Sequence, residues 1–249
     1  MKETDARCRQ AYQKLVDITR ASVKQAQATV EMLRHVATEE AEVVAQQVEH
    51  FLPLVEQAIQ QTVRRVMNEE KVPAPEKLVS LFEPHTDIIR RGKAGRPVEF
   101  GHKVWLDEVD GGIVSDYRVL DGNPADERQL PTSLDRHQAL FGRSPDQVSG
   151  DRGLYSPANE QLAKDMGVRR VILPKPGYRS AERKQHEHQP WFRRGRHYHA
   201  GIEGRISVLR RGYGLDRCRN HGEDGFERWV GWGVVAHNLR AIGTALAAR

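Results

Sequence analysis

The sequence contains only two cysteines, Cys8 and Cys218, in 249 residues. They lie far apart in the chain, and neither belongs to a CxxC pair or to a Cys/His spacing typical of metal ligands. Disulfide-stabilised domains and structural zinc sites need more cysteines at closer spacing. Both classes are therefore excluded, and the two cysteines are interpreted as reduced thiols.

Long apolar runs are also lacking. No segment approaches the roughly 18 uninterrupted apolar residues of a membrane helix, and the charged N-terminus is not followed by the apolar core of a secretory signal. We therefore expect a cytoplasmic protein with no membrane partner. Hydrophobic residues make up 38% of the chain, which is enough to build the core of a globular domain.

Positive charge is present but unevenly distributed. The whole chain carries a net charge of +5, whereas residues 169–228 hold 15 Lys and Arg against 7 Asp and Glu, a local net charge of +8. Arginine outnumbers lysine in this segment, and a planar guanidinium matches phosphate oxygens better than a point charge does. The pattern indicates binding to nucleic acid, and a solvated basic face with no partner is the alternative.

The first 70 residues predict two long amphipathic helices, because apolar residues recur at spacings of three and four. We expect the break between them near His35–Glu40. Pro53 is expected to kink or restart the second helix, since proline lacks the backbone N–H. The two prolines in Val72–Lys77 end the helical region. We predict a helical hairpin or coiled-coil arm over residues 1–76 and a second domain over residues 77–249.

A β-hairpin is predicted next. The segments Glu99–Asp107 and Ile113–Leu120 are rich in strand-forming residues, and the Asp110-Gly111-Gly112 run between them is typical of a tight turn. The two strands are expected to pair antiparallel.

Helices and strands alternate after this hairpin. Asp126 is expected to cap a helix that ends near Phe141. A short strand over Gln147–Asp151 and another over Val168–Leu173 flank a helix over Ser156–Met166, which has Ser156 as its cap and proline at its first position. This order of strands and helices indicates an α/β or α+β domain.

The remaining chain is predicted to be a basic arm followed by two helices. Residues 175–198 show almost no apolar periodicity and are expected to form a loop. A helix is expected over His199–Leu209 and another over Gly222–Ala247. The expected packing face of the last helix consists of Phe226, Trp229, Val230, Val234, Leu239 and Ile242.

Two acidic residues are the candidates for chemistry. Asp151 follows a short strand and has Gly150 and Gly153 beside it, at the kind of strand end where open α/β sheets bind ligands. A turn residue that caps the next helix is the alternative for Asp151. Glu203 stands between Gly201 and Gly204 on a predicted helix, where glycine costs about 1 kcal/mol relative to alanine. We expect metal or DNA close to the backbone there, and a solvated glutamate paired with an arginine is the alternative.

Several blocks in this order resemble the DDE transposase domain of bacterial insertion sequences, in particular the group labelled ISNCY. The blocks that carry the resemblance are Val79–Glu108, Gly122–Leu130, Gly150–Glu160, Leu173–Gly177, Ala200–Gly222 and Glu227–Gly243. The resemblance implies an RNase H-like fold with a mixed sheet and a site of three carboxylates that holds two Mg²⁺ ions. In such a site the paired metals stabilise the entering and leaving oxygens of a DNA phosphodiester.

The resemblance assigns two of the three carboxylates to this sequence. Asp151 matches the second carboxylate and Glu203 the third, and both are therefore expected to be catalytic residues and metal ligands. The first carboxylate lies in such transposases on a central strand upstream of the helical insertion, and Asp87 is the one acid positioned to replace it. We therefore expect an N-terminally truncated, incomplete sheet and a catalytically defective enzyme.

Double-stranded DNA is the expected partner, with a homodimer as the candidate assembly and the nucleoid as the expected location. The residues expected to contact DNA are Lys175, Arg193, Arg194, Arg196, Arg205, Arg210 and Arg211. Trp191, His197 and Tyr198 are candidates for stacking on unpaired bases, with packing as the alternative. Two further readings of the whole chain stay open: a DNA-binding or dimerisation fragment without catalysis, and an ordinary α/β domain in which Asp151 and Glu203 are surface residues.

Overall fold

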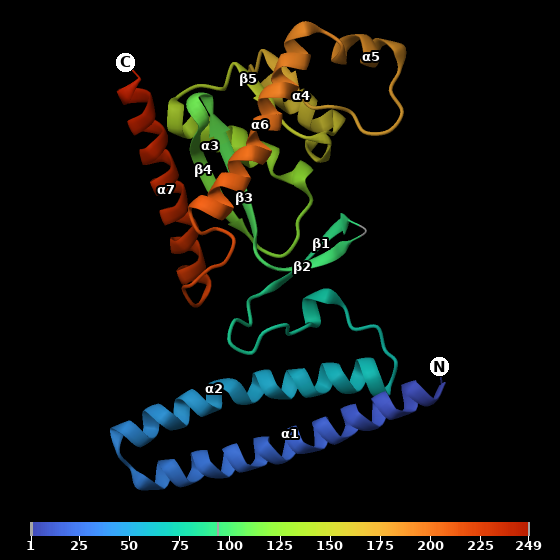
Figure 1. Ribbon diagram of the computed structural model, residues 1–249, viewed down its shortest axis with the longest axis vertical. Coiled ribbons are helices and arrows are strands. Elements are labelled where there is room, and N and C mark those ends of the chain that lie inside the picture. Colours follow the sequence, from blue (N-terminus) through green and yellow to red (C-terminus); the bar gives the residue numbers. More distant parts are fainter. Residues whose placement is uncertain (1, 94, 249) are drawn as a thin grey trace. The chain divides into compact units, whose positions relative to one another are not determined.

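The computed structural model describes residues 2–93 and 95–248, which form two compact units that divide after Gly101 (Figure 1). The first unit begins with the predicted helical hairpin. Helix α1 spans Lys2–Val36 and helix α2 spans Glu39–Thr62, and a π-helical turn over Val63–Met67 follows. The Thr38 hydroxyl caps α2 by accepting a hydrogen bond from the Ala41 N–H at 3.2 Å. Along the described chain, no helix combines the length and hydropathy that a membrane crossing requires.

Helix α2 continues through Pro53 without a break, so the expected restart at this residue is wrong. Pro53 lies on the exposed side of the hairpin. The carbonyl that loses its helical N–H partner, four residues earlier, is therefore on the side that water can reach. The opposite side of the hairpin carries most of the small apolar core of this unit. The buried apolar residues of the unit are Val16, Val30, Ala41, Ala45 and Ile59 in the hairpin, and Val72 and Leu78 after it.

A second hairpin completes the first unit. Strands β1 (Asp87–Lys93) and β2 (Arg96–Gly101) pair antiparallel, with Ile89 opposite Glu99. The predicted single strand Glu99–Asp107 is therefore divided. Its first residues pair with β1, and Gly101 then adopts a φ of +138°, which redirects the chain before the next strand begins.

The second unit contains the predicted antiparallel hairpin. Strand β3 spans Lys103–Val109 and strand β4 spans Ile113–Leu120, joined by a turn over Asp110–Gly112. Gly111 and Gly112 have φ values of +80° and +74°, which explains why glycine is needed at both turn positions. Helix α7 (Glu223–Ala247) packs against β4 (Figure 1).

A short parallel pair forms the other sheet of this unit. Strands β5 (Gln147–Ser149) and β6 (Arg170–Ile172) are connected through helix α4 (Pro157–Asp165), which Ser156 caps as predicted. Helix α3 spans Leu130–Phe141. Asp126 does not cap α3, since it starts a separate 3-10 turn over Asp126–Arg128 and the cap residue of α3 is Gln129. The described strands form three two-stranded sheets, which gives a mixed helix-and-sheet fold without one continuous sheet.

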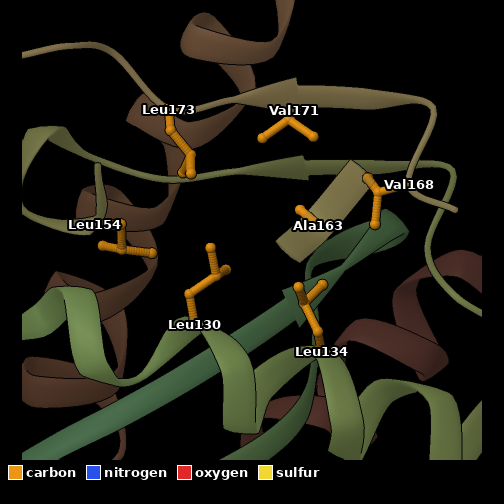
Figure 2. Close-up of a cluster of buried hydrophobic side chains, with 7 residues drawn as sticks. All are labelled: Leu130, Leu134, Leu154, Ala163, Val168, Val171 and Leu173. Carbon is orange, nitrogen blue, oxygen red and sulfur yellow. The ribbon is translucent and has the colours of Figure 1, made fainter. Parts of the chain in front are cut away.

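Two apolar clusters form the core of the second unit. Figure 2 shows the first, in which side chains from α3, α4, β6 and the turns next to them converge beside the parallel pair: Leu130, Leu134, Leu154, Ala163, Val168, Val171 and Leu173. Trp105 of β3 and Val148 of β5 pack against this cluster, so both sheets share it. The second cluster joins β4 to the last two helices through Val114, Leu209, Val230 and Val234.

The expected loop over residues 175–198 is wrong, because most of it is helical. Helix α5 spans Ala181–Glu187 and helix α6 spans Pro190–Gly212. Ser180 caps α5 and a proline starts α6, which are sequence signals of helix beginnings. Apolar periodicity is absent because the fully buried Phe192 and Gly195 anchor α6, while ion pairs hold α5.

Two of the six residues expected on the packing face of α7 are also wrong. Val230 and Val234 are buried as expected, but Leu239 and Ile242 are 65% and 47% exposed. The face that packs on the β3–β4 hairpin continues instead through two polar residues. The His237 Nε2 atom lies 3.0 Å from the Gly112 carbonyl, and the Asn238 side chain exchanges two hydrogen bonds with the backbone of Val114.

Candidate active site

Asp151 lies two residues beyond the end of β5, on the turn that follows this strand. Its side chain is exposed, and its Oδ1 atom accepts a hydrogen bond from the Gly153 N–H at 2.8 Å. A Cβ atom on Gly150 would lie 2.8 Å from a methyl group of Leu154, so the turn folds tightly over the strand end. The local fold thus presents the Asp151 carboxylate at the carboxyl end of a parallel strand, as the sequence predicts.

Asp126 is a neighbour of Asp151 that the sequence interpretation missed. A Cβ atom built on Gly153 would lie 3.1 Å from Asp151 Oδ1 and 3.2 Å from Asp126 Oδ2. Two carboxylates therefore flank the same glycine. Lys103 Nζ lies 2.5 Å from Asp126 Oδ1, and this ion pair offsets the second negative charge. The sequence does not indicate that Asp126 lies close to Asp151 and Lys103, because the three residues belong to separate turns and strands.

Helix α6 carries Glu203 and is attached to both sheets. At its first turns, Gly195 lies so close to β6 that an added Cβ would be 2.2 Å from Ile172 Cδ1. Further along, Arg205 forms a bidentate pair with Glu108 of β3, at 3.0 and 2.9 Å. The Arg205 guanidinium lies directly against Gly112, where a Cβ atom would be 2.6 Å away. These two contacts determine how α6 passes the end of the parallel pair.

Glu203 lies between these two contacts, on an exposed part of α6. Apart from the adjacent residues and the backbone of α6 itself, no atom of the described residues comes within 4 Å of a Cβ atom built on Gly201 or Gly204. Packing within the protein therefore does not require glycine on either side of Glu203. The open surface leaves room for a ligand beside the Glu203 backbone.

The charges of Asp151 and Glu203 both affect one imidazole, that of His199. His199 precedes Glu203 by four residues on α6, so their side chains lie on the same side of the helix. Burial lowers the pKa of His199, while the negative charges of Asp151, Glu203 and Glu108 act in the opposite direction. Both candidate carboxylates thus lie within electrostatic range of the same ring, although 52 residues separate them. The His199 Nδ1 atom is buried without a hydrogen-bond partner.

The donor chemistry of this region suits a hard cation. Among residues 2–93 and 95–248, Asp151 and Glu203 form no ion pair with a basic side chain, although the surrounding segment is rich in arginine. Carboxylate oxygens are the ligands that Mg²⁺ prefers. Within the same described residues, no group of three or more His, Cys, Asp or Glu side chains has a geometry that would hold a metal ion.

The expected DNA-binding residues divide into two groups. Arg205 is paired with Glu108, Arg210 with Asp216 at 2.6 Å, and Arg211 donates to the Ser207 hydroxyl. In contrast, Arg193, Arg194 and Arg196 are exposed and have no carboxylate partner among the described residues. Lys175 donates its backbone N–H to Glu187.

The expected stacking residues also have different surroundings. Trp191 makes edge contacts with His186 and Phe192, at ring-centroid distances of 5.3 and 5.5 Å, so it packs within the fold. Tyr198 lies next to Glu108 and Asp110, and burial together with these charges raises its pKa. His197 is exposed.

Asp87, the candidate replacement for the first carboxylate, begins β1 in the first unit.

Comparison with known proteins gives one match. The model of the transposase DDE domain family matches residues 108–239, which is more than half of the chain and includes Asp126, Asp151, His199 and Glu203. No curated protein and no solved structure matches the chain. Since this model matches more than half of the chain, the chain belongs to the transposase DDE domain family.

Proposed function

We propose that this protein acts on DNA in transposition, with Asp151 and Glu203 as the carboxylates of a metal-dependent site for phosphodiester cleavage and strand transfer. The observation that supports this most directly is that the segment matching the family contains both carboxylates, and that the charges of both act on the pKa of His199. Double-stranded DNA, including the ends of the mobile element and the target, is the proposed substrate.

Mg²⁺ is the proposed cofactor, and when bound it would stabilise the charge that develops on the phosphate oxygens. The part played by the chain is positional. Asp151 is held at its strand end by the Gly153 N–H, and Glu203 is held on α6 by the Gly195 and Arg205 contacts. The open surface at Gly201 and Gly204 lets a DNA backbone approach Glu203.

An RNase H-like arrangement is part of the proposal. The order of an antiparallel hairpin followed by a parallel pair, with α3 and α4 between the strands, supports it. The Trp105 and Val148 side chains, one from each sheet, reach the same core cluster. We further propose a homodimer, since α1 leaves Leu15 and Ile18 more than half exposed.

A second candidate function is DNA binding without catalysis. The absence of a three-residue metal group among the described residues favours it, as does the ion pair that Lys103 makes with Asp126. A site with two assigned carboxylates out of three is expected to hold metal weakly and to be catalytically defective. Both candidate functions include DNA binding. They differ in whether the protein also cleaves the DNA.

Cleavage of duplex oligonucleotides that carry the element's ends, with Mg²⁺ and with the metal chelated, separates the two candidates. Under the first, Asp151→Asn and Glu203→Gln each reduce cleavage by roughly 1000-fold, equivalent to about 4 kcal/mol of activation free energy. Asp135→Asn is the matched control, because Asp135 is an exposed acid on α3 away from the site. Mg²⁺-independent binding with no cleavage by the unmodified protein would establish the second candidate instead.

A further inference from the structure

A cavity in the second unit lies at the junction of α5 and α6, in the stretch whose sequence predicted only a basic loop. It has a volume of about 470 Å³, is partly open to solvent, and is lined by Arg179, Glu187, His188, Arg193 and Arg196. Three guanidinium groups thus face one space, with a single carboxylate among them. Small-molecule sites in proteins are typically about 300–1000 Å³, so the cavity can take a phosphate together with its neighbouring sugar.

The carboxylate in this cavity is already neutralised by the protein. Glu187 is 4% exposed and accepts hydrogen bonds from the Lys175 N–H, from Arg179 at 3.0 Å and from Arg183 at 2.9 Å. Burial alone would raise the pKa of Glu187, but these three donors outweigh it and the pKa is lowered. Glu187 therefore orients Arg179 at the cavity wall and stays ionised while doing so.

Arg183 makes this arrangement rigid. Its guanidinium also donates to Glu160 and to the Leu173 carbonyl, both at 2.6 Å, which ties α5 to α4 and to the end of β6. Arg183 and Glu187 are one helical turn apart, so a single turn of α5 carries both ends of the network. A cavity wall built on such a network is already formed before a ligand arrives, which reduces the entropy lost on binding.

Two other arginines of the cavity have no such partner. Among the described residues, Arg193 and Arg196 form no ion pair, and their spacing of three places them side by side on α6. Phe192 and Gly195 occupy the buried face of the same turns, so the arginines are directed away from the core. Like charges at this spacing destabilise a helix by a few tenths of a kcal/mol, and a bound anion removes that repulsion.

We propose that this cavity binds a phosphate group of the DNA backbone, with Arg179, Arg193 and Arg196 as the ligands and Glu187 as a positioning residue. The assignment to DNA rests on the proposed function, whereas the affinity for phosphate follows from the cavity alone. Arg196 precedes Glu203 by seven residues, about 10 Å along the axis of α6. The helix that carries Glu203 therefore holds the DNA a short distance from the point where that carboxylate acts.

The first test uses inorganic phosphate as the probe and thermal unfolding as the readout, at constant ionic strength with chloride as the reference. Phosphate is expected to raise the Tm by about 3 °C when it is well above its Kd. The double variant Arg193→Gln/Arg196→Gln should lose this shift. Arg240→Gln, which removes an exposed arginine from the middle of α7, is the matched control and should keep it. An equal shift in the double variant overturns the proposal, and so does an absent shift in the unmodified protein.

The second test measures binding of a duplex oligonucleotide without divalent metal over a range of salt concentrations. Losing one phosphate contact should lower the slope of log K against log salt by about 0.9 and weaken binding roughly tenfold. The double variant should show both effects and Arg240→Gln neither. Phosphate binding that depends on the arginines, combined with unchanged DNA binding, overturns the assignment to DNA.

A single variant makes the two proposals separable. Asp151→Asn should abolish metal-dependent cleavage while leaving the phosphate-dependent Tm shift and the salt slope unchanged. If the unmodified protein fails to cleave DNA but the cavity variants still change the slope, the proposed catalysis fails and the phosphate site stands. If cleavage occurs and the slope does not change, the phosphate site fails.

Discussion

Two stretches of the same helix, both containing glycine, differ in what surrounds them. At the start of α6, Gly195 lies so close to β6 that an added Cβ atom would be 2.2 Å from Ile172 Cδ1. Two turns later, a Cβ atom built on Gly201 or Gly204 would have no atom of another described element within 4 Å. Glycine at the first position permits close packing, whereas at the other two it leaves the surface beside Glu203 open. The comparison separates the part of α6 that is anchored from the part that is available to a ligand.

The largest effect on this arrangement is expected from removing the second anchor. Arg205→Gln leaves the Glu108 carboxylate, whose side chain is 5% exposed, without its bidentate partner. Removing one member of a buried pair costs about 3–5 kcal/mol, and the 35% exposure of Arg205 favours the lower end, about 3 kcal/mol. Urea unfolding measures the change. Arg210→Gln is the control, since its pair with Asp216 is exposed and should contribute less than about 1 kcal/mol. Equal losses in the two variants would contradict the anchoring role.

Adding one methyl group at the first anchor should have the next largest effect. Gly195→Ala forces its Cβ against Ile172, and overpacking of this kind costs about 1–3 kcal/mol despite the better helix propensity of alanine. Ile172→Val removes the Cδ1 atom that would clash. The double variant should therefore be more stable than Gly195→Ala alone, and a strictly additive double-mutant cycle would show that the contact is not the cause.

The same substitution in the open stretch should have the opposite sign. Gly201→Ala and Gly204→Ala are each expected to stabilise the protein by roughly 0.5–1 kcal/mol, because alanine is the better helix former and no atom obstructs it. If a DNA backbone approaches Glu203 there, the same variants should bind DNA less tightly. Unfolding and DNA titration of one sample test both statements. Destabilisation by either variant would mean that the surface is not open.

The smallest effect on stability is expected from lowering the pH. Acid acts on the ion pairs of Glu187, which hold α5 beside the anchored end of α6. Glu187 has a lowered pKa, so its contribution to stability is complete above the ordinary pKa of glutamate and is lost as the pH falls through the lowered folded value. The free energy of unfolding should therefore fall as the pH drops below the ordinary pKa of glutamate, about 4.3. In Glu187→Gln this acid-dependent part should be smaller. Parallel curves for the two proteins would contradict the assignment.

Much of the local structure could be predicted because single residues carry strong signals. Ser156 followed by proline gives the start of α4, and Asp110-Gly111-Gly112 gives the turn between β3 and β4. The placement of Asp151 at a strand end also follows from its neighbours. These features depend on the backbone preferences of a few neighbouring residues, and such preferences can be read directly from the sequence.

The remaining features depend on partners that are distant in the chain. The helical nature of residues 181–198 results from ion pairs of Glu187 and the burial of Phe192, which apolar periodicity does not register. The approach of Asp126 to Asp151 arises across a glycine that gives no signal of it. Leu239 and Ile242 lie on the correct helix but outside the packed face, because polar His237 and Asn238 take the positions next to the hairpin.

The pair between Arg205 and Glu108 joins residues that are 97 positions apart. Closing so long a loop is slow compared with forming a helix or a hairpin, which take microseconds or less. During synthesis the β3–β4 hairpin leaves the ribosome well before α6, and its buried acid then has no partner. The docking of α6, which carries Glu203, is consequently among the last events in the folding of this unit.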